Sequence, residues 1–197
     1  MNLLAVSFVT NDWYAKEAIR LEESVQKYNI QHQLFRYGSE DWGWNRSVRS
    51  KPAFILERLR NLSGEFGGLL YVDADAKFLA VPNWSLFDKL DVGAHWFKRR
   101  GENVEILTGT LFFRRSDVVE TFVRRWIELT ARVHEDSKTP EQDSIKLVVA
   151  EMCNDLRIGD FGPELCWVYD EFGHYHPKKT PVIEHYQASR KYRRLYP

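Results

Sequence analysis

The stretch LLYVDADAKF, residues 69–78, runs from four apolar residues directly into two carboxylates, Asp73 and Asp75. The apolar run is typical of a buried strand, but a strand alone does not explain two acids at its end. Residues i and i+2 of an extended segment point to the same side, so these carboxylates repel each other unless a cation lies beside them. Oxygen ligands suit Mg²⁺ or Mn²⁺, which commonly bridge substrate phosphates. The pattern therefore indicates a metal–diphosphate site.

Strand and helix patterns alternate along the chain and must position these carboxylates. Helices are expected after a cap at Thr10 or Asn11, from Pro52, after Ser116, and from Thr139–Pro140 to about Met152. Strands are expected at 3–9, 32–37, 69–73, 92–97 and 106–113, with short ones within 156–159, 164–169 and 181–186. This order predicts one α/β domain, residues 1–197, with a Rossmann-like, mostly parallel sheet flanked by helices. Ligands of such sheets bind outside the carboxyl ends of the strands.

Composition excludes some function classes. The 28 Lys and Arg balance the 28 Asp and Glu, so no general attraction to nucleic acid or membrane is implied. Residues 171–197 hold six Lys/Arg against two Asp/Glu, a local excess of four positive charges. Cys153 and Cys166 fit neither a disulfide framework nor a zinc site, which predicts free thiols. The first residues lack a basic leader, and no stretch reaches the ~20 apolar residues of a membrane span. We expect a cytoplasmic protein.

Several segments resemble, in order, those of one enzyme family. SFVTNDWY and LEESVQKYN are similar to an opening strand and first helix, and KPAFILERL to the helix before an Asp-x-Asp motif in GGLLYVDADAKF. LTGTLFFRRS resembles the floor of a sugar pocket, PEQDSIKLVV an Asp-Gln helix start, and IEHYQASRK a C-terminal segment that supplies a metal-binding His. The family is that of the metal-dependent nucleotide-diphospho-sugar glycosyltransferases with a glycosyltransferase-A fold. The resemblance covers nearly the whole chain and implies sugar transfer from a nucleoside diphosphate sugar, with UDP favoured.

The resemblance assigns the metal to Asp73, Asp75 and His185, and the imidazole would favour Mn²⁺ over Mg²⁺. Asp73 would also contact the ribose. Thr10 and Tyr14 would line the nucleobase pocket. Each has an ordinary structural alternative: a turn for the two aspartates, a core histidine, a helix cap for Thr10 and packing for Tyr14.

Basic residues would meet the diphosphate of the donor. Lys51 would reach a phosphate beside the free N–H groups of a helix that starts near Pro52. Arg190 and Lys191 would neutralise the leaving diphosphate. Solvated surface positions are the alternative for all three cations.

The sugar and the acceptor would meet at Gly109, Gln142 and Asp143. Gly109 would let the sugar approach the backbone, although it could instead mark a bulge. Gln142 and Asp143 would hold sugar or acceptor hydroxyls, although acids at a helix start also complement its dipole. The triplet Glu141-Gln142-Asp143 departs from the family's Asp-Gln, which leaves the roles within it open. The resemblance favours retention of anomeric configuration; an inverting enzyme would need a base, for which Asp143 or Asp170 could serve.

Other readings compete with the transferase. An Asp-dependent phosphohydrolase usually has Thr or Val where this chain has Ala76-Lys77, and it needs a later acidic pair. A sugar nucleotidylyltransferase should open with a Gly-rich loop, which VTNDWYAKE lacks. A nucleotide-sugar-binding module without turnover stays open. The acceptor could be a saccharide, a protein, a small molecule or a hydroxylated DNA base. Trp42, Trp44 and the basic C-terminus allow DNA, but neutral net charge argues against it.

Overall fold

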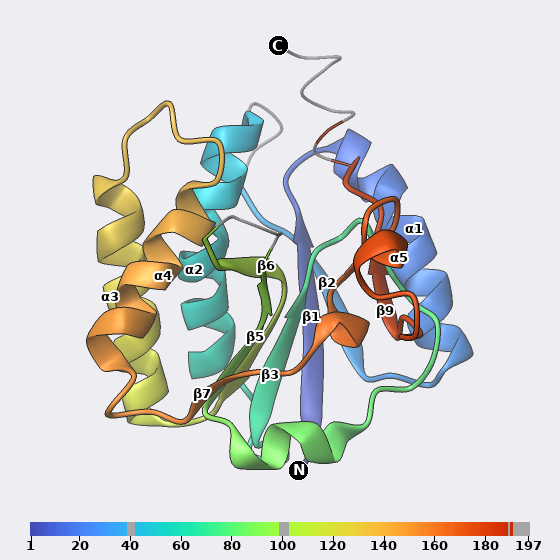
Figure 1. The fold of residues 1–197 in the computed structure, drawn as a ribbon, viewed down its shortest axis with the longest axis horizontal. Helices are drawn as coiled ribbons and strands as arrows, with labels where there is room; N and C mark the ends of the chain where they lie inside the picture. The colour runs from blue at the N-terminus through green and yellow to red at the C-terminus, as the bar shows by residue number, and fades with distance from the viewer. Residues whose placement is uncertain (39–41, 99–102, 189, 191–197) are drawn as a thin grey trace.

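A six-stranded sheet runs through the middle of the molecule (Figure 1). The computed structural model describes residues 1–38, 42–98, 103–188 and 190. In spatial order the strands are β2 (His32–Arg36), β1 (Leu3–Val9), β3 (Gly68–Val72), β6 (Glu105–Arg114), β5 (Val92–Phe97) and β7 (Ile158–Asp160). Three of the five strand pairs are parallel, and β6 runs antiparallel to both of its neighbours. The expected mostly parallel α/β sheet is confirmed.

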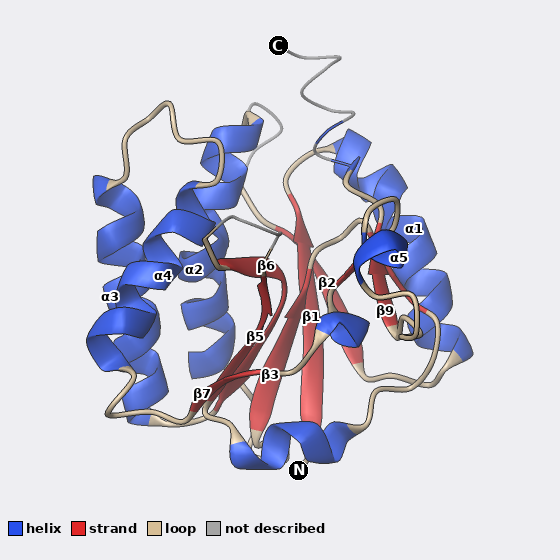
Figure 2. Cartoon of the chain, viewed as in Figure 1, coloured by secondary structure: helices blue, strands red, loops and turns tan. Residues whose placement is uncertain are grey.

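Helices cover both faces of this sheet (Figure 2). One face packs against α2 (Trp44–Arg60), α3 (Asp117–Arg132) and α4 (Pro140–Met152), with the fully buried Trp126 at the centre of the contact. The other face packs against α1 (Asp12–Lys27) and the C-terminal segments. The apolar strands β1 and β3 are therefore buried on both sides, as expected for strands between two helical layers.

A second sheet of three short strands lies on the α1 side. Its order is β4 (Ala76–Phe78), β9 (Ile183–His185) and β8 (Trp167–Val168). Ala76 pairs with His185, and Val168 pairs with the same residue from the other side. Two 3₁₀ turns (Trp84–Lys89 and Pro163–Leu165) and the short helix α5 (Phe172–Tyr175) complete the fold. This small sheet brings the C-terminal segment next to the end of β3.

Helix starts follow local signals, with one exception. The side chains of Asn11 and Ser116 accept hydrogen bonds from Tyr14 N–H and Val119 N–H, and α4 begins at Pro140, as the sequence predicts. The prediction that a helix begins near Pro52 is wrong. Helix α2 begins at Trp44, so residues 44–51 are helical and Pro52 lies inside the helix.

Tertiary contacts explain the early start of α2. Proline in a helix removes one backbone hydrogen bond, a cost that favours a boundary there. The turns before Pro52 are nevertheless held by hydrogen bonds from Asn45 and Arg49 to the last turn of α3 and the segment that follows it. These long-range bonds offset the local preference. Among the described residues, no helix has both the length and the apolar character needed to cross a membrane.

Candidate functional site

A cavity opens at the edge of the main sheet where β1 and β3 end. Strand β6 is antiparallel, so its first half reaches the same edge and supplies Leu107, Thr108 and Gly109. The cavity measures about 200 Å³, more than ten times the roughly 10–15 Å³ that one water needs. Its lining includes six of the residues expected from the sequence to act on metal or donor: Thr10, Tyr14, Lys51, Asp73, Asp75 and His185.

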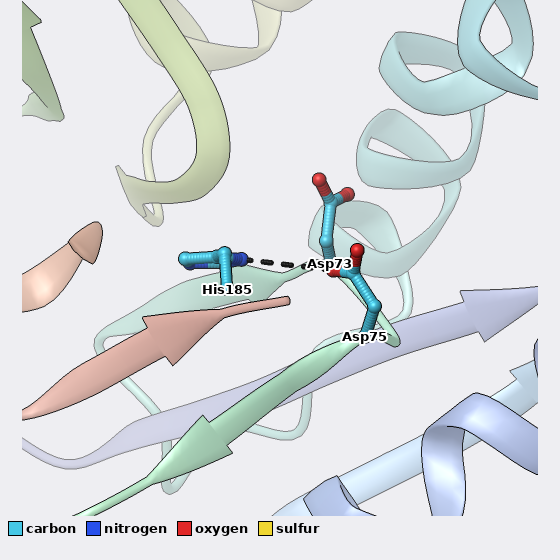
Figure 3. Close-up of side chains that lie close together, drawn as sticks. All are labelled: Asp73, Asp75 and His185. Carbon is cyan, nitrogen blue, oxygen red and sulfur yellow. Dashed lines mark ion pairs between the residues drawn. The ribbon is translucent and has the colours of Figure 1, made fainter. Parts of the chain in front are cut away.

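Asp73, Asp75 and His185 converge on one side of the cavity (Figure 3). Asp73 directly follows β3, Asp75 directly precedes β4, and His185 is the last residue of β9. One ligand atom from each lies within 4.8 Å of the others. The pairing of Ala76 with His185 sets this arrangement, because it fixes the imidazole beside the carboxylates. The structure thus brings together residues separated by more than one hundred positions.

Neighbouring groups orient the two inner ligands. Asp75 Oδ2 accepts the Ala188 N–H at 2.6 Å, and His185 Nε2 lies 2.9 Å from Thr110 Oγ1. Among the described residues, the buried Nδ1 of His185 has no hydrogen-bond partner, and it lies 3.9 Å from Asp75 Oδ1. A free nitrogen held opposite a carboxylate, with the other nitrogen hydrogen-bonded, is the arrangement of a metal-binding histidine. These residues fit a divalent ion such as Mn²⁺ or Mg²⁺.

Asp75 and His185 shift each other's pKa. Burial disfavours the charged form of Asp75, but His185 and the Ala188 N–H more than offset it and lower the carboxyl pKa. Burial also opposes the imidazolium of His185, yet the Cys166 sulfur and the Asp75 carboxylate raise its pKa to about 10. A metal ion bound by His185 would displace this proton, because a metal-binding imidazole is neutral.

Lys51 enters the cavity as a buried cation. Its Nζ lies 3.0 Å from Asp73 Oδ1 and donates to the Thr108 carbonyl at 3.1 Å. Tyr71 donates to the same Asp73 oxygen at 2.6 Å. Burial disfavours the ammonium, but Asp73 and Glu141 outweigh it and raise the Lys51 pKa, so the side chain is charged. The expected helix start beside Lys51 is absent because α2 begins seven residues earlier, so Lys51 contributes its own charge and not free N–H groups.

Glu141 was not assigned a role from the sequence, yet it lines the cavity. Its side chain is buried, and Oε1 accepts from Thr108 Oγ1 at 3.2 Å. Its Oε2 is buried and has no hydrogen-bond partner in the part of the chain that the structure describes. Burial raises the Glu141 pKa, against the opposing effect of Lys51. In the sequence, only the Glu-Gln-Asp triplet pointed to Glu141, and it did not show which of its three residues would contact the substrate.

The two residues expected to act on hydroxyls are placed differently. Gln142 lines the cavity. Asp143 is exposed, accepts a hydrogen bond from Ser137 Oγ at 2.8 Å, and is not part of the lining. Residues two apart on a helix point in nearly opposite directions, so Glu141 and Asp143 cannot both face the cavity.

The remaining expected residues fall in and around the cavity. Thr10 lines it while its hydroxyl lies 2.9 Å from Ser47 Oγ. A Cβ on Gly109 would lie 3.0 Å from Cε1 of His185, so the glycine leaves room for the imidazole. Arg190 lies outside the lining, with Nη2 3.4 Å from Glu171 Oε2. Lys191 lies outside the described residues.

Several lining residues had no assigned role. Trp44 and Lys138 stand at the cavity, the first from α2 and the second from the segment before α4. Gln187 lines it in a left-handed backbone conformation, with φ of 54°. Cys166, one of two free cysteines, is buried in the lining, whereas Cys153 is exposed. Of these residues, only Trp44, next to Gly43 in a polar stretch, was recognisable from the sequence as a possible contact for a ligand.

Known structures share this fold. No family model and no curated protein sequence matches the chain. A crystal structure of a glycosyltransferase involved in the glycosylation of the major capsid of PBCV-1 matches 100% of this chain and 98% of its own, with a TM-score of 0.73 and 13% identity. The glycosyltransferase GlyE of Streptococcus pneumoniae TIGR4 matches 94% of this chain and 55% of its own, with a TM-score of 0.61 and 16% identity. The chain therefore has a fold found in glycosyltransferases.

Proposed function

We propose that the protein is a metal-dependent glycosyltransferase that moves a sugar from a nucleoside diphosphate sugar, with UDP as the favoured nucleotide, to a hydroxyl acceptor. The observation that carries the proposal is the convergence of Asp73, Asp75 and His185 in a cavity at the strand ends. The likeness to solved glycosyltransferases supports the same class of reaction. The acceptor class stays open among saccharides, proteins, small molecules and hydroxylated DNA bases.

The proposed site has a place for each part of the donor. A divalent ion held by the triad would offset negative charge on the departing diphosphate. Lys51 would add a fixed positive charge beside it, because it is already held against Asp73. Thr10 and Tyr14, from the end of β1 and the start of α1, would face the nucleobase. Gln142, with Glu141 beside it, would hold sugar hydroxyls.

The test is a donor screen with the full chain. UDP-, GDP- and ADP-sugars are added with Mn²⁺, and melting temperature and nucleoside diphosphate release are measured. A donor that binds the folded state raises the melting temperature by mass action. Release of nucleoside diphosphate with transfer of the sugar supports a transferase. Stabilisation without release would indicate a binding module, and release of inorganic phosphate would indicate a phosphohydrolase; either contradicts the proposal.

Asp75→Asn is the matched variant for this test. The asparagine carbonyl can still accept the Ala188 N–H, but the side chain loses the charge that attracts a metal. We expect Mn²⁺ binding and turnover to be nearly lost while the melting temperature of the metal-free protein stays within a few degrees. The control is Asp136→Asn, because the Asp136 side chain is 91% exposed and lies outside the cavity. An Asp75→Asn protein with unchanged turnover would refute the metal role.

A further inference from the structure

Arg49 makes an unusual set of hydrogen bonds outside the cavity. Its Nη1 donates to the carbonyls of Thr130 and Val133 at 2.9 and 3.1 Å, and its Nη2 donates to that of His134 at 2.7 Å. A helix end leaves its last carbonyls without partners, and α3 ends at Arg132. One planar guanidinium on α2 therefore caps the end of α3, some eighty residues away in sequence.

Asn45 extends this connection by one residue. Its side-chain amide donates to the Glu135 carbonyl at 2.7 Å and accepts from Arg49 Nε at 2.5 Å. Together, Arg49 and Asn45 hold four carbonyls between residues 130 and 135. Figure 1 shows the α3–α4 connection running beside the first turns of α2. We call this set of bonds the α2–α3 clamp.

The clamp joins two walls of the cavity. Helix α2 supplies Trp44, Ser47 and Lys51 to the lining, and the segment that follows the clamped carbonyls supplies Lys138 and Thr139. Beyond that segment α4 has its own anchor, because Trp126 Nε1 donates to the Glu141 carbonyl at 3.0 Å. The clamp therefore holds residues 133–135, which lead into Lys138 and Thr139, while Glu141 and the metal-binding triad are held by other contacts.

We propose that Arg49 is a positioning residue, which holds the wall carrying Lys138 and Thr139 at the distance from α2 that the nucleotide-sugar donor requires. This inference rests on the proposed function. The guanidinium fork is needed because it meets three carbonyls in fixed directions, which a lysine ammonium on a flexible stem does not reproduce. Arg49 itself is not part of the cavity lining and acts only through the segment that it holds.

The test compares Arg49→Gln and Arg49→Lys with matched changes at Arg46, three residues earlier on the same helix. Arg46 is exposed, and its guanidinium lies over the Trp42 ring. It therefore has the same charge as Arg49 and lies on the same helix, but it makes none of the clamp bonds. Four quantities are measured for each variant: the Kd for UDP with Mn²⁺, the Kd for Mn²⁺ alone, and KM and kcat for the donor.

We expect Arg49→Gln to raise the UDP Kd and the donor KM about tenfold, because a displaced wall weakens contacts made in both ground and transition states. The kcat and the Mn²⁺ Kd should stay within about twofold, since the triad is held by other strands. Arg49→Lys should raise the UDP Kd and the donor KM by a smaller factor. It replaces Arg49→Gln as the test variant if the glutamine variant does not fold. Arg46 variants should match the wild type.

Three results would overturn the inference: an unchanged donor KM, an equal loss of Mn²⁺ binding, or a fall in kcat alone. Equal loss of metal binding would mean that Arg49 supports the whole fold and not one wall. Failure of the proposed function is separable, because wild-type protein would then bind no UDP with Mn²⁺, whereas failure of the clamp appears only in the variants.

Discussion

Around Lys51 the cavity gathers three carboxylates, those of Asp73, Asp75 and Glu141. Lys51 is paired with Asp73, and burial favours the neutral form of Glu141, so the Asp75 carboxylate still needs a positive partner. In the metal-free protein the proton on His185 supplies part of that positive charge. A divalent cation would supply it in full once His185 is neutral. The charges around Lys51 therefore favour a metal ion more strongly than the Asp-x-Asp spacing alone.

We predict that His185→Ala changes which metal the protein prefers. If the imidazole binds the ion, Mn²⁺ should bind and activate the wild type better than Mg²⁺, because nitrogen ligands favour transition metals. The alanine variant, left with carboxylates, should show a smaller Mn²⁺/Mg²⁺ ratio. Titration calorimetry with each ion measures the ratio directly. The same ratio in both proteins would return His185 to a structural role.

Glu141→Gln tests which acid of the triplet acts on the substrate. Glutamine can still accept from Thr108 through its carbonyl, but it loses the negative charge. We expect kcat/KM to fall by about 10²-fold, as for the loss of a charged group in a closed site, with Mn²⁺ affinity nearly unchanged. Asp143→Asn is the comparison, and its exposed position predicts activity close to wild type. A larger loss in Asp143→Asn would instead support the role that the sequence assigned to Asp143.

At the scale of elements, Asp91 connects three strands. It precedes β5, its carboxylate accepts from Arg157 Nη2 at 2.7 Å just before β7, and Arg114 Nε at the end of β6 lies 3.0 Å away. The hydrogen bond from Arg157 is the main reason that the Asp91 pKa falls to about 2. The folded pKa lies below the unfolded value of about 3.9, so this carboxylate stabilises the fold above that pH.

We predict that the contribution of Asp91 is lost as the pH falls from about 4 towards about 2. Asp91→Asn should lower the free energy of unfolding by about 1–2 kcal/mol at neutral pH, since the pair is partly exposed and screened. The difference from wild type should vanish at the acid end. Urea unfolding at a series of pH values measures both. Asp155→Asn, at an exposed position outside this cluster, is the control, and a pH-independent difference for Asp91→Asn would contradict the assignment.

Elements defined by local signals were predictable from the sequence. The end of β3 is visible in the sequence because the buried apolar run stops at the charged Asp73. The starts of α3 and α4 are visible because Ser116 and Pro140 act on the backbone of their own first turns. The start of α2 was not predictable, because it depends on bonds from Arg49 to carbonyls eighty residues away. The short strands β8 and β9 were expected within 164–169 and 181–186, but β4 and the pairing of all three strands into a second sheet were not. These strands are two or three residues long, and the sheet exists only because β9 pairs with β4 on one side and with β8 on the other.

The candidate site was predictable to the same extent. Asp73 and Asp75 stand together in sequence, but nothing local indicates that His185 joins them or that Gln187 lines the same cavity. His185 came from the family resemblance, which carries long-range information that composition and periodicity lack. The choice between Glu141 and Asp143 needed the phase of α4, because a triplet at a helix start does not show which member faces inward.

At the scale of the whole molecule, the chain matches the full length of one glycosyltransferase structure but about half of another. The chain holds the cavity and the metal-binding triad at one edge of its main sheet, and both helical layers contribute to the lining. Within the described residues, the basic excess of the C-terminal region is partly used internally, since Arg190 lies beside Asp170 and Glu171. That pairing weakens the argument for a nucleic-acid acceptor.

We expect the sugar to be transferred with retention of anomeric configuration. An inverting transferase needs a base beside the acceptor hydroxyl. Asp143 and Asp170, the two bases considered from the sequence, are absent from the cavity lining. Glu141 is present, but its side chain is buried and held by Thr108, which suits a contact with the bound donor better than with an incoming acceptor. NMR of the new linkage measures the outcome, and a product anomer opposite to that of the donor would refute retention and point to Glu141 as the base.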